Sequence, residues 1–136
     1  MARCTTDEGR IVGLLHDTVE DTDVTFPDLK SAGFPDHLLA SLRLVTHEDG
    51  VPYDDYIAAM MHDPTAVEVK LADLEDNSDI RRLKEISPKD VERLQKYLRT
   101  YRRLKAHQKN NANKAVDSTA TRVTPLAEQE PRHGQP

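Results

Sequence analysis

The sequence has 136 residues, 37% of them hydrophobic and 32% charged, with a formal net charge of −5. This length suits one domain, and because no apolar run approaches about 18 residues, no transmembrane helix is readable. The first ten residues lack the apolar stretch of a signal peptide, and the single cysteine, Cys4, excludes an internal disulfide framework. We therefore expect a cytoplasmic protein that does not bind membranes, in which Cys4 is an ordinary residue near a frayed terminus.

The spacing of apolar residues predicts five helical segments and no strand. The first covers about residues 6–19, where Thr6 can cap the helix and apolar residues recur at helical intervals. This apolar stripe comprises Ile11, Val12, Leu14, Leu15 and Val19. A short second helix is predicted over about 26–32, with a capping-box pattern that begins at Thr25 and a stop at Gly33.

The third and fourth segments follow in the middle of the chain. The third is predicted over about 35–46 and carries four inward-facing apolar residues: Leu38, Leu39, Leu42 and Val45. The fourth covers about 53–74, but the residue before a proline avoids the helical region. We therefore expect two helices that are separated at Asp63 and Pro64, the second of them capped by Asp63.

The last helix is predicted from Ser87 to about Lys105. Its apolar residues repeat at close to helical spacing: Val91, Leu94, Leu98, Tyr101 and Leu104. From His107 onward the chain is poor in apolar residues and rich in Asn, Thr, Gln and Pro, so burial cannot offset the entropy of ordering it. The prediction is an all-α fold: a compact helical bundle over 1–106, followed by a disordered tail over 107–136.

Charge is unevenly distributed along the chain. Residues 1–80 contain 18 acidic and five basic side chains, whereas residues 81–106 contain ten basic and three acidic ones. So acidic a body argues against a protein that binds duplex nucleic acid. The carboxylates are explained either by a site for metal ions or by a solvated acidic surface. The basic helix near 88–105 either shows a solvated charged face or attracts an anionic substrate or RNA.

The sharpest local signal lies at the end of the first predicted helix. The imidazole of His16 and the carboxylates of Asp17, Glu20 and Asp21 fall within six positions. Residues four apart share a helix face, which pairs His16 with Glu20 and Asp17 with Asp21. Such mixed nitrogen and oxygen donors suit borderline divalent metal ions, although a solvated helix end gives a His-Asp pair by chance.

A second signal, about 56 residues further on, is the run from Val69 to Asn77. Its carboxylate, Asp73, comes at the end of a partly apolar helix, and Asn77 lies one turn later. Alone, Asp73 would be an ordinary helix-end residue. The specific feature is the pair of motifs at this separation.

Together the two segments resemble the signature motifs of HD-domain metal-dependent phosphohydrolases. Within these they resemble the (p)ppGpp hydrolase domain of RelA/SpoT-type stringent-response enzymes and their small stand-alone relatives. The run from His16 to Thr22 is similar to that family's His-Asp-x-x-Glu-Asp-Thr, and the run from Val69 to Asn77 to its Val-Lys-Leu-Ala-Asp-x-x-x-Asn. The resemblance covers about residues 6–85 and implies an HD-type all-α fold.

The resemblance also implies a role for each matching residue. The implied metal ligands are His16, Asp17 and Asp73, the catalytic carboxylates Glu20 and Asp21, and the substrate-binding residues Lys70 and Asn77. The implied ion is divalent, usually manganese. A bound metal lowers the pKa of its water ligand and polarises a phosphoryl oxygen, while a carboxylate accepts the proton.

The sequence departs from the family pattern in two places. The family has a further metal-ligating histidine on an upstream helix, and no histidine precedes His16 here. We expect the bundle to be N-terminally truncated, either because the true start lies upstream or because the ligand was lost; the other histidines, including His47 in a loop, are not expected at the metal. The truncation would leave Val12 and Leu15 partly uncovered and favour a homodimer. The family's common arginine after the second-motif aspartate is replaced by Leu74, which leaves the substrate's identity open.

Three functions remain open. The first is a metal-dependent hydrolase of phosphate or pyrophosphate esters of a nucleotide, with a (p)ppGpp-type substrate and Mn²⁺ implied by the resemblance. The second is a degenerate HD-type domain that binds metal or nucleotide weakly and serves as a regulatory or interaction module. The third is a plain helical domain with acidic surface residues. We expect weak manganese binding and little turnover from this sequence.

Overall fold

The fold is all-α over the part of the chain that the structure describes, which is residues 3–133 for the backbone and 3–114 for the side chains. The computed structural model contains α1 (Asp7–Asp21), α2 (Phe26–Ser31), α3 (Asp36–Val45), α4 (Tyr53–Met60), α5 (Pro64–Asn77), the 3-10 helix η1 (Ile80–Arg82) and α6 (Pro88–His133). The predicted fold class is therefore confirmed. None of the described helices combines the length and apolar character needed to cross a membrane.

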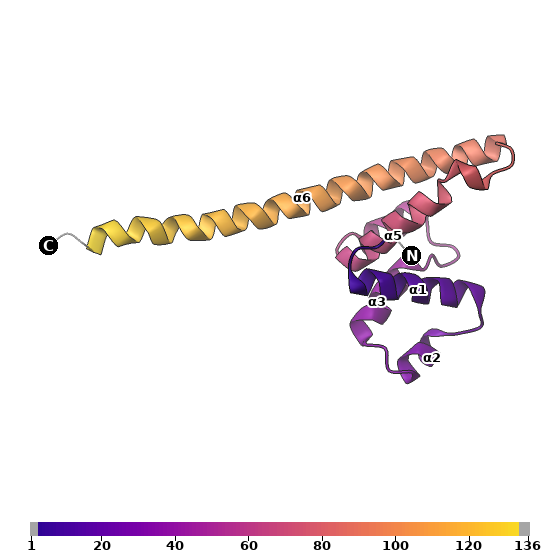
Figure 1. Ribbon diagram of the computed structural model, residues 1–136, viewed down its shortest axis with the longest axis horizontal. Helices are drawn as coiled ribbons and strands as arrows, with labels where there is room; N and C mark the ends of the chain where they lie inside the picture. Colours follow the sequence, from indigo (N-terminus) through magenta and orange to yellow (C-terminus); the bar gives the residue numbers. More distant parts are fainter. Residues whose placement is uncertain (1–2, 134–136) are drawn as a thin grey trace. The chain divides into compact units, whose positions relative to one another are not determined.

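The chain divides into two compact units, Met1–Leu104 and Lys105–Pro136. In the first unit α1 packs against α3 and α5, which also contact each other (Figure 1). α4 contacts both α3 and α5, and α2 contacts α3. The core between these helices contains the largest fully buried side chains: Leu42, Ile57, Met60, Leu74 and Leu104. Burying one such side chain contributes about 1.5–3 kcal/mol.

The helix starts follow the predicted caps. Thr6 Oγ1 accepts a hydrogen bond from the amide of Gly9 at 3.0 Å, and the predicted capping box before α2 is present. α5 begins after Asp63, whose carboxylate accepts hydrogen bonds from the amides of Thr65 and Ala66 at 3.0 and 3.1 Å. Because caps satisfy N–H groups that a helix leaves without partners, they fix where each helix begins.

The apolar stripe of α1 is only partly buried. Val12 and Leu15 are 0% and 7% exposed within the chain itself, so the expectation that they would be partly uncovered was wrong. Their burial removes the reason given for a homodimer, which stays a prediction. Leu14, by contrast, is 62% exposed, while Gly9 and Gly13 lie on the buried face. The buried face therefore includes residues too small to register in a hydrophobic pattern.

Cys4 belongs to the core, contrary to the expectation of a frayed terminus. It is 2% exposed, and burial raises the pKa of its thiol. The adjoining residues are held by Glu68 on α5, whose carboxylate accepts hydrogen bonds from the amides and hydroxyls of both Thr5 and Thr6. This anchor joins segments about 60 residues apart, so no local pattern could have predicted it.

α6 continues past the end that its sequence predicted. The helix was expected to end near Lys105 but extends to His133, so residues 107–114, predicted as disordered, are helical. Extending an existing helix is far easier than starting one, because each added residue brings one backbone hydrogen bond. In the rest of the segment predicted as disordered, the side chains of 115–136 and the backbone of 134–136 lie outside the described residues.

Candidate metal centre

One cavity of about 600 Å³ brings the two sequence motifs together. Six of the seven predicted site residues line it: His16, Asp17 and Glu20 from α1, and Lys70, Asp73 and Asn77 from α5. The α1 group, Asp73 and Asn77 belong to the C-terminal halves of their helices, and Lys70 lies at the middle of α5. The seventh, Asp21, is exposed at the end of α1 and is not among the lining residues.

His16, Asp17 and Glu20 form a compact group whose possible ligand atoms all lie within 4.8 Å of one another. Nε2 of His16 is 3.2 Å from Oε1 of Glu20, and Nδ1 is 3.9 Å from Oδ1 of Asp17. The His16 side chain is 9% exposed, whereas those of Asp17 and Glu20 are 51% and 62% exposed. One buried nitrogen beside two solvated carboxylates is a donor set that suits a borderline divalent ion.

The second imidazole nitrogen of His16 provides a test of whether these residues fit a metal ion. Nδ1 is buried and has no hydrogen-bond partner among the described residues. Leaving a buried polar atom without a partner costs about 1–3 kcal/mol, so native proteins rarely do it without a reason. Coordination of a cation through this nitrogen would satisfy it, and the residues present therefore fit the ion.

α1 and α5 both have acidic side chains in the last turn, where basic side chains are usual. A helix C-terminus carries partial negative charge and favours Lys or Arg in the last turn. The last turns of α1 and α5 contain no basic residue and instead supply Glu20 and Asp76 to the cavity. A bound cation would relieve this unfavourable electrostatic arrangement, which is the kind of local conflict found at functional sites.

Asp73 is held in the cavity by two neighbours on α5. Its Oδ2 accepts a hydrogen bond from Nζ of Lys70 at 3.2 Å, and its Oδ1 accepts one from Nδ2 of Asn77 at 3.0 Å. The predicted ligands His16, Asp17 and Asp73 thus share one cavity. The compact group within 4.8 Å, however, contains Glu20 and not Asp73.

Lys70 is a buried cation in this acidic cavity. The residue is 9% exposed, and its Nζ lies 5.2 Å from the ring centroid of Tyr56. Burial acts to lower the pKa of Lys70, but the Tyr56 oxygen and the Asp73 carboxylate outweigh it and raise this pKa above its ordinary value. Lys70 is therefore charged at neutral pH, where it can neutralise Asp73 or bind an anionic group.

Among the other lining residues, three with ring or cationic side chains were not predicted as site residues: His47, Tyr56 and Arg82. The ring of His47 stacks on Tyr56 at 4.5 Å, and its Nε2 is 2.7 Å from the carbonyl oxygen of Val51. Nη1 of Arg82 donates to the carbonyl of Asp76 at 3.2 Å. The sequence could have indicated Arg82 only as a positive charge shortly after the second motif. The positions of His47 and Tyr56 depend on tertiary packing.

Neither a family model nor a curated protein matches the chain. The cavity combines nitrogen and oxygen donors for a divalent cation with Lys70 and Arg82, two cations that can bind an anion. That combination suits a reaction in which a metal ion and a phosphorylated compound meet.

Proposed function

We propose that the chain is a metal-dependent phosphohydrolase or pyrophosphohydrolase of a nucleotide, with a (p)ppGpp-type substrate and Mn²⁺ as the ion. The observation that supports this most is that one cavity is lined by six residues from two distant motifs. These six are residues that the sequence predicted for this chemistry. The likeness of both motifs to those of HD-domain hydrolases supports it further. A cytoplasmic location and a small nucleotide as the partner belong to the same proposal.

In this proposal the divalent ion would be held by His16, Asp17 and Asp73. Glu20 lies close enough to His16 to contact the ion as well. When bound, the ion lowers the pKa of a water ligand and polarises a phosphoryl oxygen. Lys70 and Asn77 orient Asp73 through their hydrogen bonds, as partners of metal ligands commonly do.

Glu20 accepts the proton of the attacking water in this proposal. Its side chain is 62% exposed and therefore reaches solvent from the edge of the cavity. The water oxygen attacks phosphorus, the bond to the leaving oxygen breaks, and the charge of Lys70 stabilises the phosphoryl oxygens. Asp21, predicted to act with Glu20, is placed outside the lining, so we assign the proton transfer to Glu20 alone.

One observation favours a second candidate, a nucleotide-binding regulatory module without turnover. Asp73 already pairs with Lys70 at 3.2 Å, and this internal cation competes with a metal ion for the carboxylate. Leu74 also stands where the related hydrolases commonly carry an arginine. Both features weaken metal and phosphate binding relative to an efficient enzyme.

Phosphate release by the full chain, measured on guanosine tetraphosphate, simple nucleotides and NADPH at increasing Mn²⁺, tests the proposal. The matched variants are Asp17→Asn and Asp23→Asn, since each removes one charge near the end of α1 but Asp23 is exposed outside the cavity lining. We expect Mn²⁺-dependent release that Asp17→Asn abolishes and Asp23→Asn preserves. Binding of manganese or of a nucleotide in calorimetric titration, without release on any substrate, favours the regulatory module. An absence of release and of both kinds of binding contradicts both candidates.

A further inference from the structure

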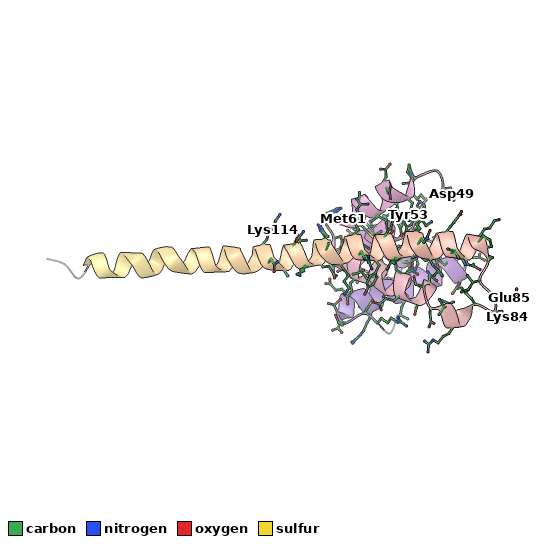
Figure 2. All side chains as sticks on the ribbon, turned by 90° about the horizontal axis from the view of Figure 1, so that it is seen from above. Asp49, Tyr53, Met61, Lys84, Glu85 and Lys114 are labelled. Carbon is green, nitrogen blue, oxygen red and sulfur yellow. The ribbon has the colours of Figure 1, made fainter. Side chains whose placement is uncertain are left out.

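A second cavity, of about 520 Å³, lies between the beginning of α4 and the part of α6 that belongs to the first unit. Lys96, Arg99 and Arg103 line it from α6, and Tyr53 and Asp54 line it from α4. Figure 2 labels Tyr53 beside this part of α6. None of these residues lines the candidate metal centre, so the second cavity is a separate site.

The three cations of this cavity share one face of α6. Positions 96, 99 and 103 follow the i, i+3, i+7 spacing of one helix face and spread over about 10 Å at 1.5 Å per residue. On the same helix, the guanidinium of Arg93 forms an ion pair with the carboxylate of Asp90. Within the described part of the chain, by contrast, no carboxylate forms an ion pair with Lys96, Arg99 or Arg103.

Tyr53 orients one of these cations through its ring. Nζ of Lys96 lies 4.3 Å from the ring centroid of Tyr53, a cation–π contact that holds the half-buried lysine in the wall. Against the single carboxylate of Asp54, the wall offers three cations, and it has a net charge of +2.

We propose that this cavity binds a compact anion with several phosphate groups, such as inorganic tripolyphosphate or the phosphate chain of a nucleotide. The row of cations is longer than one phosphate, and arginine binds phosphate oxygens in pairs. RNA fits less well, because the body of the protein over 1–80 is strongly acidic and Tyr53 is the one aromatic ring in the lining. Successive bases would find no stacking platform there. The site does not depend on the proposed hydrolysis.

Calorimetric titration of the full chain with inorganic tripolyphosphate, in EDTA so that no divalent ion contributes, tests this site. The test variant is Arg99→Gln/Arg103→Gln, and the matched control is Lys89→Gln/Arg102→Gln, which removes the same charge from α6 outside the cavity. All four side chains are exposed, so both variants should keep the helical circular dichroism and melting temperature of the unchanged chain. We expect the test variant to bind about tenfold more weakly, as loss of two solvent-exposed phosphate contacts predicts, and the control to bind nearly as before.

A parallel titration with ATP distinguishes the two sources of the phosphate chain. Equal affinity for ATP and tripolyphosphate identifies the phosphate chain alone as the ligand, and tighter binding of ATP identifies a nucleotide; both support the site. Absence of tripolyphosphate binding, or equal weakening in both double variants, would overturn it. Tighter binding of a single-stranded oligonucleotide than of tripolyphosphate would also overturn it, because the surface would then be a nucleic-acid groove.

Discussion

Nε2 of His16 lies 3.2 Å from Oε1 of Glu20, one turn further along α1. The contact joins a buried imidazole to a carboxylate that is exposed to solvent. With Asp17, these residues form a group whose possible ligand atoms all lie within 4.8 Å of one another. The remaining nitrogen of His16 has no partner among the described residues. The three residues are the candidate ligands of one cation, and we expect each of them to contribute to holding it.

Glu20→Gln keeps the size of the side chain and removes its charge. We expect it to weaken Mn²⁺ binding by about 10- to 100-fold, the usual effect of removing a residue that supports a metal site. Calorimetric titration with Mn²⁺ measures this, and Glu48→Gln, an exposed loop residue outside the cavity lining, serves as the control. Equal affinity in Glu20→Gln and the unchanged chain would show that Glu20 takes no part in holding the ion.

Lys70→Met keeps the apolar stem of the lysine but removes the cation from the cavity. Since Asp73 then loses its positively charged partner at 3.2 Å, we expect Mn²⁺ to bind more tightly. Guanosine tetraphosphate, titrated without metal, should bind more weakly, because the positive charge that attracts phosphate is gone. If both ligands lost affinity together, Lys70 would be a structural residue and not a competitor for the metal.

Gly9→Ala should destabilise the protein although alanine favours helices. A Cβ at Gly9 would lie 2.6 Å from Oε2 of Glu68 and 2.9 Å from Oγ1 of Thr6. Alanine usually gains about 1 kcal/mol over glycine in a helix, but Glu68 is fixed by hydrogen bonds and cannot move aside freely. We expect urea denaturation to show a free energy of unfolding lower by about 1 kcal/mol.

The same substitution in a Glu68→Ala background provides the control. With the carboxylate removed, the close approach to Oγ1 of Thr6 remains, so Gly9→Ala should cost clearly less stability than it does in the unchanged chain. The difference between the two backgrounds measures the coupling of Gly9 and Glu68. Identical effects in both backgrounds would mean that the close approach does not determine stability.

Glu68 should also make the fold sensitive to acid. Burial acts to raise the pKa of Glu68, but the hydrogen bonds from Thr6 and Thr5 outweigh it and lower this pKa below its ordinary value. Because the pKa is lower in the folded state than in the unfolded chain, Glu68 contributes stability above the unfolded pKa. That contribution is lost as the pH falls through the folded pKa.

Urea midpoints of the unchanged chain and of Glu68→Gln measure this contribution. The midpoints should differ at neutral pH, and the difference should shrink below about pH 4, near the ordinary glutamate pKa. A difference that stays constant down to about pH 3 would contradict the assignment, since an ionised Glu68 would then not be the cause.

The helix starts could be predicted from the sequence, but the buried faces only in part. A cap depends on residues within one turn, so Thr6 and Asp63 were recognisable locally. A buried face depends on what the rest of the chain packs against it. On α6, Thr100 is 7% exposed and Leu98 is 51% exposed, the reverse of what hydrophobicity alone indicates.

The candidate site was predictable as a set of residue types and not as a geometry. The i, i+4 spacing paired His16 with Glu20, and the structure has that contact. The sequence did not indicate that Lys70 would form an ion pair with Asp73. Lys70 is buried against Tyr56 on α4, and that contact depends on tertiary packing. His47 likewise reaches the cavity only through the packing of the loop after α3.

Paramagnetic broadening by Mn²⁺ measures whether α1 and α5 together form one metal centre. Amide NMR spectra of the full chain are recorded while Mn²⁺ is added in amounts well below one equivalent. We expect the amides of residues 16–20 and 70–77 to lose intensity together, and the amides of α2 to keep their intensity. Broadening confined to one of the two helices, or spread evenly over the acidic surface, would contradict it.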